Sequence, residues 1–456
     1  MKDYNNVYKG EIIDIVDSLK KGHFSVFCGA GATADSTGVT WKDLFKKALS
    51  VLDKDVTDYY RLAEYYKLQY GRNKLITEVS SAFSKINSSK HIEHLLNLPM
   101  FSYWTTNFDC IIEQMISSKT NVIPSVIYDS KNVIKLNEDK RYKVFKMNGS
   151  ITDGDSMVLT SSDYEAYKFT QKPLVEFLKR ELVLNTFLFV GYSFDDNLVL
   201  SCLSENKKHF PSLDNYHYRI EKKQLDHSNF QEIEKKYFEE NYNIKTIFVD
   251  TYDEIDELID FLHLEYKKNN VYISGSFRNL SVKEENYAND LCKEIVEKLF
   301  AQDLTIHSGD GKRLGSYIIT NATKHLMNNN GFIQNKLKIM PYIDHSFKSK
   351  QANHVDRVKL IDEMIADSSV SIFMYGQSED GGVSDGVMQE YYQSREQGKI
   401  LIPIPTTGYA AEAIFNDMKE RGLPGYLEKY DCILANEKDI EKLVKTVLEI
   451  INISTM

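Results

Sequence analysis

The spacing of apolar residues switches repeatedly between the period of a helix and that of a buried strand. Ile12, Val16 and Leu19 recur at helical spacing, and Gly22 follows as a stop. From about residue 41 to residue 98 the pattern is again mostly helical. Apolar runs typical of buried strands occur at 24–28, 101–109, 141–150, 186–196, 216–223 and 244–250. Strands that alternate with helices predict a parallel α/β sheet here.

Two local signals predict helix starts in this half. Ser162 and Glu165 have the spacing of a capping box, in which the two residues satisfy each other's free backbone N–H groups. Pro173 precedes an amphipathic run and suits the first turn of a helix, because its missing N–H would be unpaired there. We therefore expect helices to begin near these two positions.

The same rhythm restarts after a highly polar stretch, EYKKNN, at 265–270. Helices are predicted at 283–300 and 438–452, and a strand, glycine turn and helix at 304–320. Further strands are predicted at 270–277, 369–376 and 399–408. The fold class expected is α/β, with two Rossmann-like parallel-sheet domains in tandem, 1–268 and 269–456.

Composition narrows the class of protein. A chain of 456 residues with 42% hydrophobic and 27% charged residues is typical of a soluble protein of two domains. The net charge of −10, without a Lys/Arg-rich stripe, argues against nucleic acid as a partner. No apolar run is long enough for a membrane span, and the polar start is unlike a secretory signal. Five scattered cysteines argue against a zinc module or a disulfide framework, so we expect a cytoplasmic protein without metal.

A glycine turn follows the first predicted strand. Gly29, Ala30 and Gly31 precede Thr33 and a predicted helix. Glycines let the backbone approach a pyrophosphate closely, and a helix start directs N–H groups at it. A tight turn without a ligand is the alternative for so short a motif.

Two more strand ends carry polar groups, and open α/β sheets bind ligands at such ends. Asn107 and Asp109 follow the predicted strand at 101, where an amide beside a carboxylate can hold a ribose hydroxyl and position a water. Gly191 and Ser193 follow the strand at 186, where the serine can bond a phosphate or a ribose. An Asx turn at the first loop and a simple turn at the second are the alternatives.

Together these loops resemble the sirtuin family, specifically its bacterial zinc-free branch. The family order is a GAG turn, a T-[QT]-N-[IFY]-D strand end, an H-G strand end and a G-x-S loop. This chain has GAGAT, TTNFD, KMNG and GYSF in that order, within residues 8–265. The resemblance implies NAD as the substrate bound by these loops, with Asn107 positioning a water and a ribose hydroxyl.

Two features depart from that family. The four-cysteine zinc module of lysine-deacylating sirtuins is absent, which favours simple NAD cleavage over deacylation. Asn148 stands where the family has its catalytic histidine, and an asparagine cannot serve as a general base near neutral pH. His91 and His94 are predicted to lie on a helix face rather than to replace that histidine.

A second set of glycine loops lies in the C-terminal half and resembles the SLOG superfamily, which binds nucleotides in a Rossmann-like pocket. The phosphoribohydrolase motif of its relatives is not intact at 380–390, so a sensor is more plausible than a second hydrolase. The residues that we predict to bind a signal nucleotide are Gly275, Ser276, Arg278, Gly309, Gly311, Gly315, Arg357 and Glu390. Both arginines could equally be solvated surface residues.

A sirtuin-like domain followed by a SLOG domain resembles the effector family of the Thoeris anti-phage defence system. This implies an NAD+ glycohydrolase activated when a cyclic ADP-ribose isomer, made by a TIR-domain partner enzyme, occupies the C-terminal pocket. It also implies a homo-oligomer, tetramer or larger. Two alternatives stay open: a sensor that binds NAD and nucleotide without turnover, because of Asn148, and an NAD-dependent deacylase.

Overall fold

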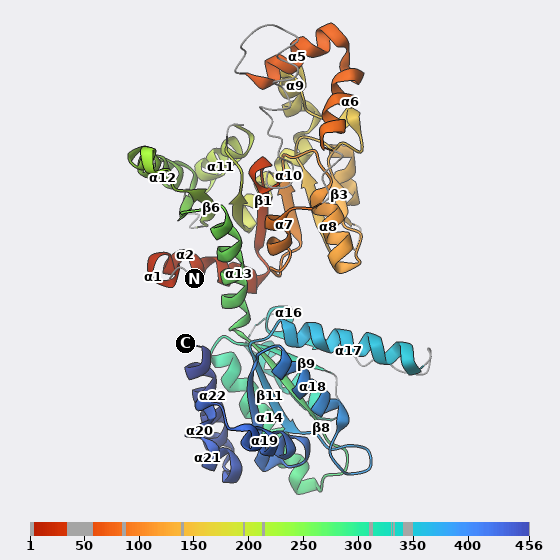
Figure 1. Ribbon diagram of the computed structural model, residues 1–456, viewed down its shortest axis with the longest axis vertical. Coiled ribbons are helices and arrows are strands. Elements are labelled where there is room, and N and C mark those ends of the chain that lie inside the picture. Colours follow the sequence, from red (N-terminus) through yellow and green to blue (C-terminus); the bar gives the residue numbers. More distant parts are fainter. Residues whose placement is uncertain are drawn as a thin grey trace. The chain divides into compact units, whose positions relative to one another are not determined.

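The computed structural model describes residues 4–33, 58–83, 88–137, 141–194, 197–211, 215–309, 313–329, 331, 333–340 and 350–455 (Figure 1). The chain divides into two compact units, Met1–His263 and Leu264–Met456. The division falls inside helix α13 (Asp253–Lys267), and the predicted boundary at residue 268 lies directly after that helix.

The first unit is built on a parallel sheet. Its seven strands among the described residues have the order β3-β4-β2-β1-β5-β6-β7, and every neighbouring pair is parallel, as predicted. The order changes direction at β1, whose neighbours are β2 and β5, and such a switch point is where an open α/β sheet binds ligands. The strands are β1 (Phe24–Cys28), β2 (Ser102–Thr105), β3 (Ser125–Ile127), β4 (Lys143–Lys146), β5 (Thr186–Val190), β6 (His217–Lys222) and β7 (Ile244–Val249).

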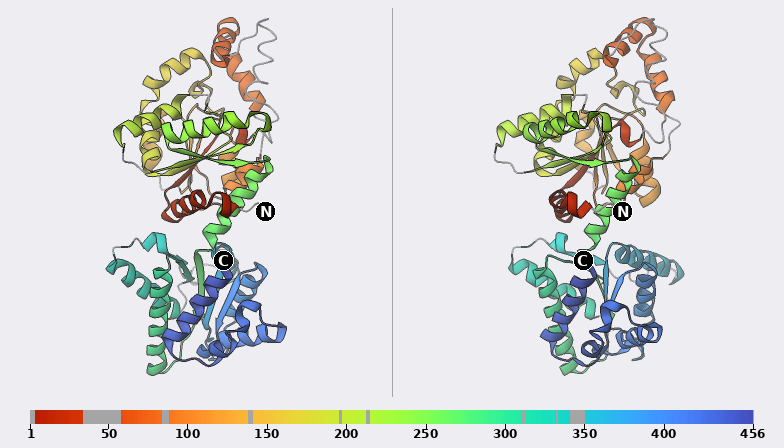
Figure 2. Two further views of the ribbon diagram at one scale, coloured as in Figure 1. Left: turned by 90° about the vertical axis from the view of Figure 1, so that its left-hand side faces the viewer. Right: turned by 60° about the vertical axis from the view of Figure 1, so that its left-hand side comes forward.

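Helices cover both faces of this sheet (Figure 2). Trp104 of β2 stacks on Phe145 of β4 with ring centroids 4.0 Å apart, and both rings are buried in the core under the helices. Besides α13, the helices among the described residues of this unit are α1 (Tyr4–Val7), α2 (Lys9–Lys21), α5 (Tyr59–Tyr70), α6 (Arg72–Phe83), α7 (Lys90–Leu95), α8 (Ile111–Thr120), α9 (Ser161–Thr170), α10 (Lys172–Leu184), α11 (Asn197–His209) and α12 (Ser228–Tyr242).

The start of α9 corrects one prediction. The capping box is formed by Thr160 and Asp163, whose side chains each accept a hydrogen bond from the other's backbone N–H, rather than by Ser162 and Glu165. Ser162 lies within the first turn, and its hydroxyl donates to Glu64 of α5 instead. Both pairs have the same spacing of three residues, so spacing alone could not distinguish them. Pro173 lies in the first turn of α10, as predicted.

The second unit is a smaller parallel sheet of the same kind. Among its described residues five strands have the order β10-β9-β8-β11-β12, and all pairs are parallel. The strands are β8 (Asn270–Ser276), β9 (Thr305–Gly309), β10 (Leu337–Met340), β11 (Val370–Tyr375) and β12 (Ile400–Ile404). The helices are α14 (Val282–Ala301), α15 (Leu314–Asn328), α16 (Ile333–Lys336), α17 (Lys350–Ala366), α18 (Asp385–Glu396), α19 (Tyr409–Arg421), α20 (Gly425–Glu428), α21 (Asp431–Asn436) and α22 (Ile440–Thr455). The prediction of two Rossmann-like parallel sheets in tandem is therefore confirmed.

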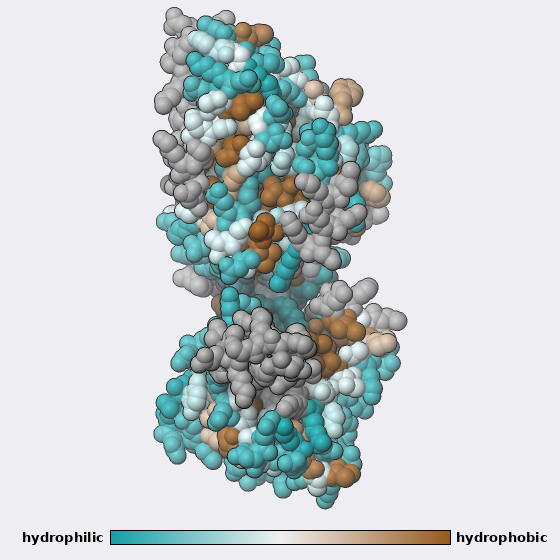
Figure 3. Space-filling model, turned by 90° about the vertical axis from the view of Figure 1, so that its right-hand side faces the viewer, coloured by the Kyte–Doolittle hydropathy of each residue, from teal (hydrophilic) through white to brown (hydrophobic). Residues whose placement is uncertain are grey.

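The surface is mixed. On the face drawn in Figure 3, apolar residues form separate spots among hydrophilic ones. In the described part of the chain, every helix is too short or too polar to cross a membrane.

Candidate functional site

Gly29 and Gly31 pack against Gly191 where β1 and β5 end. The N–H of Gly29 donates to the carbonyl of Val190 at 3.0 Å, and that of Gly31 donates to the carbonyl of Gly191 at 2.9 Å. A Cβ on Gly29 would lie 2.3 Å from the Gly191 oxygen, and one on Gly191 would lie 2.1 Å from the Ala32 nitrogen. The backbones touch so closely that no side chain fits between them.

Most backbone N–H groups of the glycine turn already donate hydrogen bonds within the protein. The amides of Gly29, Gly31, Ala32 and Thr33 all donate to backbone carbonyls, whereas Ala30 is exposed. Close packing of two backbones therefore accounts for these glycines by itself, and contact of the turn with a pyrophosphate stays a prediction. The helix predicted to follow falls largely on residues 34–57, outside the described residues.

We expect Gly191→Ala to destabilise the first unit by about 3 kcal/mol or more, because a positive φ and a backbone clash add together. Gly191 has φ +61°. Gly22→Ala is the matched control, because Gly22 has φ +69° but nothing lies within 4 Å of its added Cβ. Urea unfolding of both variants measures the difference, and equal losses would show that the close contact at Gly191 is easily relieved.

Asn107 connects the loop after β2 to the glycine turn. Its Nδ2 donates to the Gly29 carbonyl at 3.1 Å and to the Thr33 hydroxyl at 3.2 Å, and the side chain is buried. Thr105 receives the N–H of Asn107 on its hydroxyl at 2.9 Å, which fixes the loop locally. Since both amide hydrogens are directed at the turn, Oδ1 is the atom that can accept from a ribose hydroxyl or a water.

Asp109 and Lys146 hold this loop in place through hydrogen bonds. One Asp109 oxygen accepts the Ile111 N–H at 3.1 Å, and burial raises the pKa of the carboxyl. Lys146, fully buried at the end of β4, donates to the carbonyls of Phe108 and Asp109 and pairs with Glu113 at 2.9 Å. The predicted site set did not include Lys146. A lysine that directly follows the apolar pair Val144 and Phe145, at the end of the strand, is the signal that could have found it.

Asn148 lies two residues beyond Lys146, close to the loops already described. Its side chain is 7% exposed, and its backbone carbonyl accepts the Val158 N–H at 2.9 Å. Gly149, with φ +89°, packs so tightly that a Cβ would lie 2.3 Å from the Ser156 oxygen. Lys146 also donates to Ser150 at 3.3 Å, so one buried ammonium group joins the Asn107 loop to the Asn148 loop.

Among the described residues, no hydrogen bond or ion pair joins the remaining predicted residues of this unit to Asn107 or Asn148. Ser193 is exposed in the loop after Gly191. His91 and His94 lie on α7, as predicted, and their Nδ1 atoms meet Asp256 at 2.5 Å and Asp260 at 2.7 Å on α13. The two histidines are thus occupied in helix–helix contacts. Within the described residues no group of three or more His, Cys, Asp or Glu side chains could hold a metal ion.

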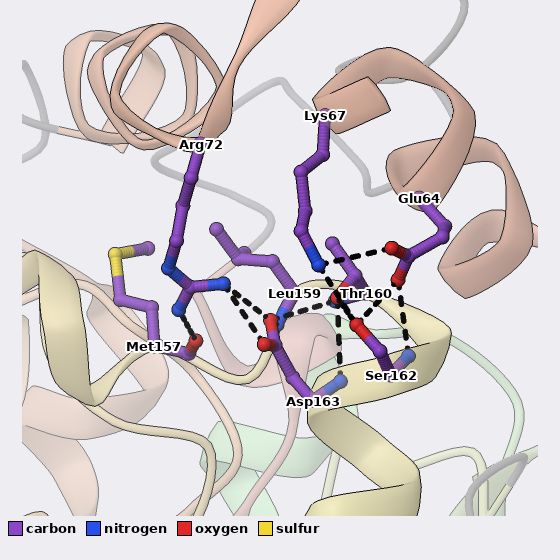
Figure 4. A network of polar contacts seen from close by, with 8 residues as sticks. All are labelled: Glu64, Lys67, Arg72, Met157, Leu159, Thr160, Ser162 and Asp163. Carbon is purple, nitrogen blue, oxygen red and sulfur yellow. Dashed lines mark hydrogen bonds and ion pairs between the residues drawn. The ribbon is translucent and has the colours of Figure 1, made fainter.

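The α5–α6 hairpin is attached to the start of α9 by a polar network (Figure 4). Arg72 donates to both oxygens of Asp163, at 2.9 and 2.8 Å, and to the Met157 carbonyl at 2.9 Å. Glu64 accepts from Lys67 at 2.9 Å and from the Ser162 hydroxyl at 2.7 Å. Burial alone would raise the pKa of Glu64, but these hydrogen bonds outweigh it and lower the pKa to about 2.

The lowered pKa makes the contribution of Glu64 to stability depend on pH. A carboxylate whose pKa is depressed in the folded state stabilises the protein above its unfolded pKa and loses that effect as the pH falls. For Glu64 the window runs from 4.5 down to about 2. We expect the Tm difference between the unmodified chain and Glu64→Gln to be constant at neutral pH and to shrink through that window. A difference that persists unchanged at the acid end would contradict the role of the charge.

In the second unit, the loops after β8 and β11 are joined at the switch point of the sheet. Gly275 has no room for a Cβ, which would lie 2.1 Å from the Met374 carbonyl. Ser276 donates to the carbonyl of Gln377 at 3.1 Å. Gln377 in turn accepts the backbone N–H groups of Arg278 and Asn279, both at 3.0 Å. The predicted site set did not include this buried glutamine, because it is not part of any sequence motif that we identified.

Several of the predicted signal-binding residues lie near one another around the end of β8. A Cβ on Gly275 would touch Leu314, the neighbour of Gly315, and the strand that ends at Gly309 pairs with β8. The guanidinium of Arg278 pairs with Glu379, and the Glu390 carboxylate accepts from Tyr272 at 2.9 Å and Ser274 at 2.5 Å. Both charges therefore have protein partners already. Gly309 ends β9, Gly315 is buried in the first turn of α15, Arg357 lies in α17, and Gly311 is outside the described residues. Ligand contact by each of them stays a prediction.

A pocket of about 610 Å³ lies beside the loop after β12. Gly408 and Tyr409 line it at the start of α19, together with Glu284 of α14, Gly382 and Asn416. Of the predicted signal-binding residues that the structure describes, none lines it. Tyr409 links the pocket to the switch point, because its hydroxyl accepts a hydrogen bond from Gln377 at 3.0 Å.

Comparison with known families accounts for both units. Residues 102–247 match the SIR2-like domain, and residues 254–454 match the Sir2- and TIR-associating SLOG family. The chain joins a SIR2-like domain to a SLOG domain. The SIR2-like match includes Asn107, Asn148 and Gly191, whereas the glycine turn at 29–31 precedes it.

Several curated proteins resemble this SIR2-like and SLOG chain over most of their length. The protein of Bacillus cereus (strain MSX-D12) named NAD(+) hydrolase ThsA is 29% identical, with 97% of each chain covered. Proteins of the same name from Cytobacillus dafuensis and Enterococcus faecium are 28% and 27% identical. The alignments cover 94% and 96% of this chain, and 91% and 97% of those relatives.

Proposed function

We propose that this chain is an NAD+ hydrolase that releases nicotinamide by adding water to the ribosyl carbon. The observation that carries the proposal is Asn107, which lies at the switch point of a SIR2-like sheet with its amide bonded to the glycine turn. The name of the full-length relatives, NAD(+) hydrolase, supports it.

The residues of the site can supply what this reaction needs. Nicotinamide leaves as a neutral group, so the barrier lies in stabilising positive charge on the ribose and in placing a water. Asn107 Oδ1 would accept from the water or a ribose hydroxyl. Asp109 would orient the same loop by accepting the Ile111 N–H, and Lys146 would hold the loop through the carbonyls of Phe108 and Asp109. Gly29, Ala30, Gly31, Thr33, Gly191 and Ser193 would line the dinucleotide.

We further propose that a cyclic ADP-ribose isomer, made by a TIR-domain enzyme, binds the SLOG domain and activates hydrolysis. The 610 Å³ pocket has a volume typical of small-molecule sites, and its wall belongs to loops at the carboxyl edge of the parallel sheet. We also propose that the protein acts as a homo-oligomer, tetramer or larger, which light scattering of the purified chain would measure.

The test is nicotinamide release from NAD by the purified chain, with and without a panel of cyclic ADP-ribose isomers. Release that depends on one isomer supports both proposals, and release without any isomer supports hydrolysis but removes the gating. Calorimetry with NAD alone, run in parallel, separates binding from turnover.

A sensor that binds NAD without cleaving it is the second candidate, and Asn148 favours it. With an amide at the position of the family's histidine, the site lacks a side chain that could take a proton from water near neutral pH. Saturable NAD binding with no nicotinamide release under any of these conditions would support this candidate over the first.

A further inference from the structure

The segment from Ser156 to Thr160 lies between the α5–α6 hairpin and the candidate site. On the site side it touches the Asn148 loop three times. The Val158 N–H donates to the Asn148 carbonyl at 2.9 Å, and Ser150 donates its N–H to the Ser156 hydroxyl at 3.0 Å. The third contact is the Gly149 backbone, which leaves no space for a Cβ beside the Ser156 carbonyl.

On its other side the same segment is held by charge. The guanidinium of Arg72 binds Asp163 with Nη1 and the Met157 carbonyl with Nη2, so that one planar group joins a side chain to the backbone (Figure 4). Asp163 also accepts the N–H groups of Leu159 and Thr160, both at 3.1 Å. Arg72 therefore fixes the Met157 carbonyl directly, and it fixes the N–H groups of Leu159 and Thr160 through Asp163.

Polar groups attach the hairpin in addition to the apolar side chains that α5 and α6 bury. Besides Arg72, Glu64 and Lys67 both bond Ser162, and the packing of Tyr60 on Tyr164, with ring centroids 5.1 Å apart, adds an aromatic contact. Ile76 of α6 covers Gly154, where a Cβ would lie 2.6 Å from its methyl group. The ion pairs of this interface fix geometry more than they add stability, because partly exposed ion pairs contribute little free energy.

We propose that Arg72 is a positioning residue for NAD turnover. It holds the Met157–Thr160 segment, and that segment holds Asn148 and Gly149 against the Asn107 loop. The structural part of this inference stands by itself, whereas its effect on turnover rests on the proposed NAD+ hydrolase function. We call these contacts, from Arg72 through the Met157–Thr160 segment to Asn148 and Gly149, the Arg72 brace. A displacement of about 1 Å at a reacting group can cost about 100-fold in rate, so loss of the brace is expected to be visible in kinetics.

The test compares Arg72→Ala, Arg72→Lys and a matched control, Arg180→Ala, which removes an arginine from the Arg180–Glu181 pair on α10. Hydrogen–deuterium exchange reports the brace without any need for activity. For Arg72→Ala we expect exchange at the amides of residues 148–158 to rise by about tenfold. Arg180→Ala should leave them unchanged. Arg72→Lys should rescue only partly, because one ammonium group cannot reproduce the planar fork.

Kinetics then test the functional part. We expect Arg72→Ala to lower kcat/KM for NAD by about 10- to 100-fold, with added millimolar guanidinium restoring part of the loss. A purely structural role would lower Tm and the amount of folded enzyme without changing KM or responding to guanidinium. Exchange and kinetics that match those of Arg180→Ala would overturn the inference. An unmodified chain that neither binds nor cleaves NAD would overturn the proposed function, while the exchange result would still decide the brace.

Discussion

Replacing Asn107 with alanine is expected to lower kcat/KM for NAD hydrolysis by about 10²- to 10³-fold, the loss typical of removing one preorganised polar group from a transition state. The variant removes the oxygen that would position the water. It also cuts the hydrogen bonds to Gly29 and Thr33 that place the loop. Steady-state nicotinamide release, normalised to folded protein, measures the effect.

A second buried asparagine provides the control. Asn206 of α11 donates through its amide to the Lys179 carbonyl at 2.9 Å, in the same unit but in a helix contact. Asn206→Ala should cost a similar amount of stability, about 1–3 kcal/mol for a buried carbonyl left unpaired, with little change in kcat/KM. Activity of Asn107→Ala within twofold of the unmodified chain would remove Asn107 from the mechanism.

The fold could be predicted from the sequence because its strands are short apolar runs between amphipathic helices. The strand at 186 is correct in place and orientation, although it ends at Val190, before the polar residues that belong to the loop. β3 and β10 were not predicted, because β3 has only three residues and β10 follows α16 without a turn signal between them. The capping box was misplaced because two overlapping pairs share the same spacing, and only contacts with α5 distinguish them.

The structure brings the predicted residues of the N-terminal site together for a physical reason. Asn107, Asp109 and Asn148 directly follow strands whose ends meet at one edge, so position along the chain fixes position in space. Lys146 and Arg72 act on that site through backbone carbonyls. A carbonyl is present at every residue, so no sequence pattern marks such contacts. The pocket of the second unit lies largely beside β12 and α19, and Gly382 of the glycine loop at 380–390 also lines it.

The substitution Asn148→His is expected to raise the rate of NAD hydrolysis by about 10²- to 10⁴-fold, the range typical of a general base. Asn148 is almost fully buried, and the Lys146 ammonium lies beneath the same loop. Burial and a nearby positive charge both lower the pKa of a histidine below its usual value of about 6.5. The imidazole should therefore be neutral, and able to accept a proton, at pH 7.

The pH profile distinguishes a base from a better-fitting side chain. For Asn148→His, kcat/KM should rise as the pH increases through the pKa of the new histidine and then level off, because only the neutral ring accepts a proton. Asn148→Gln, which has no titrating group, should show no such limb. If both variants are equally active at every pH, a base at this position is dispensable. The orientation of the water by Asn107 and the electrostatics of the buried Asp109 would then have to account for the rate on their own.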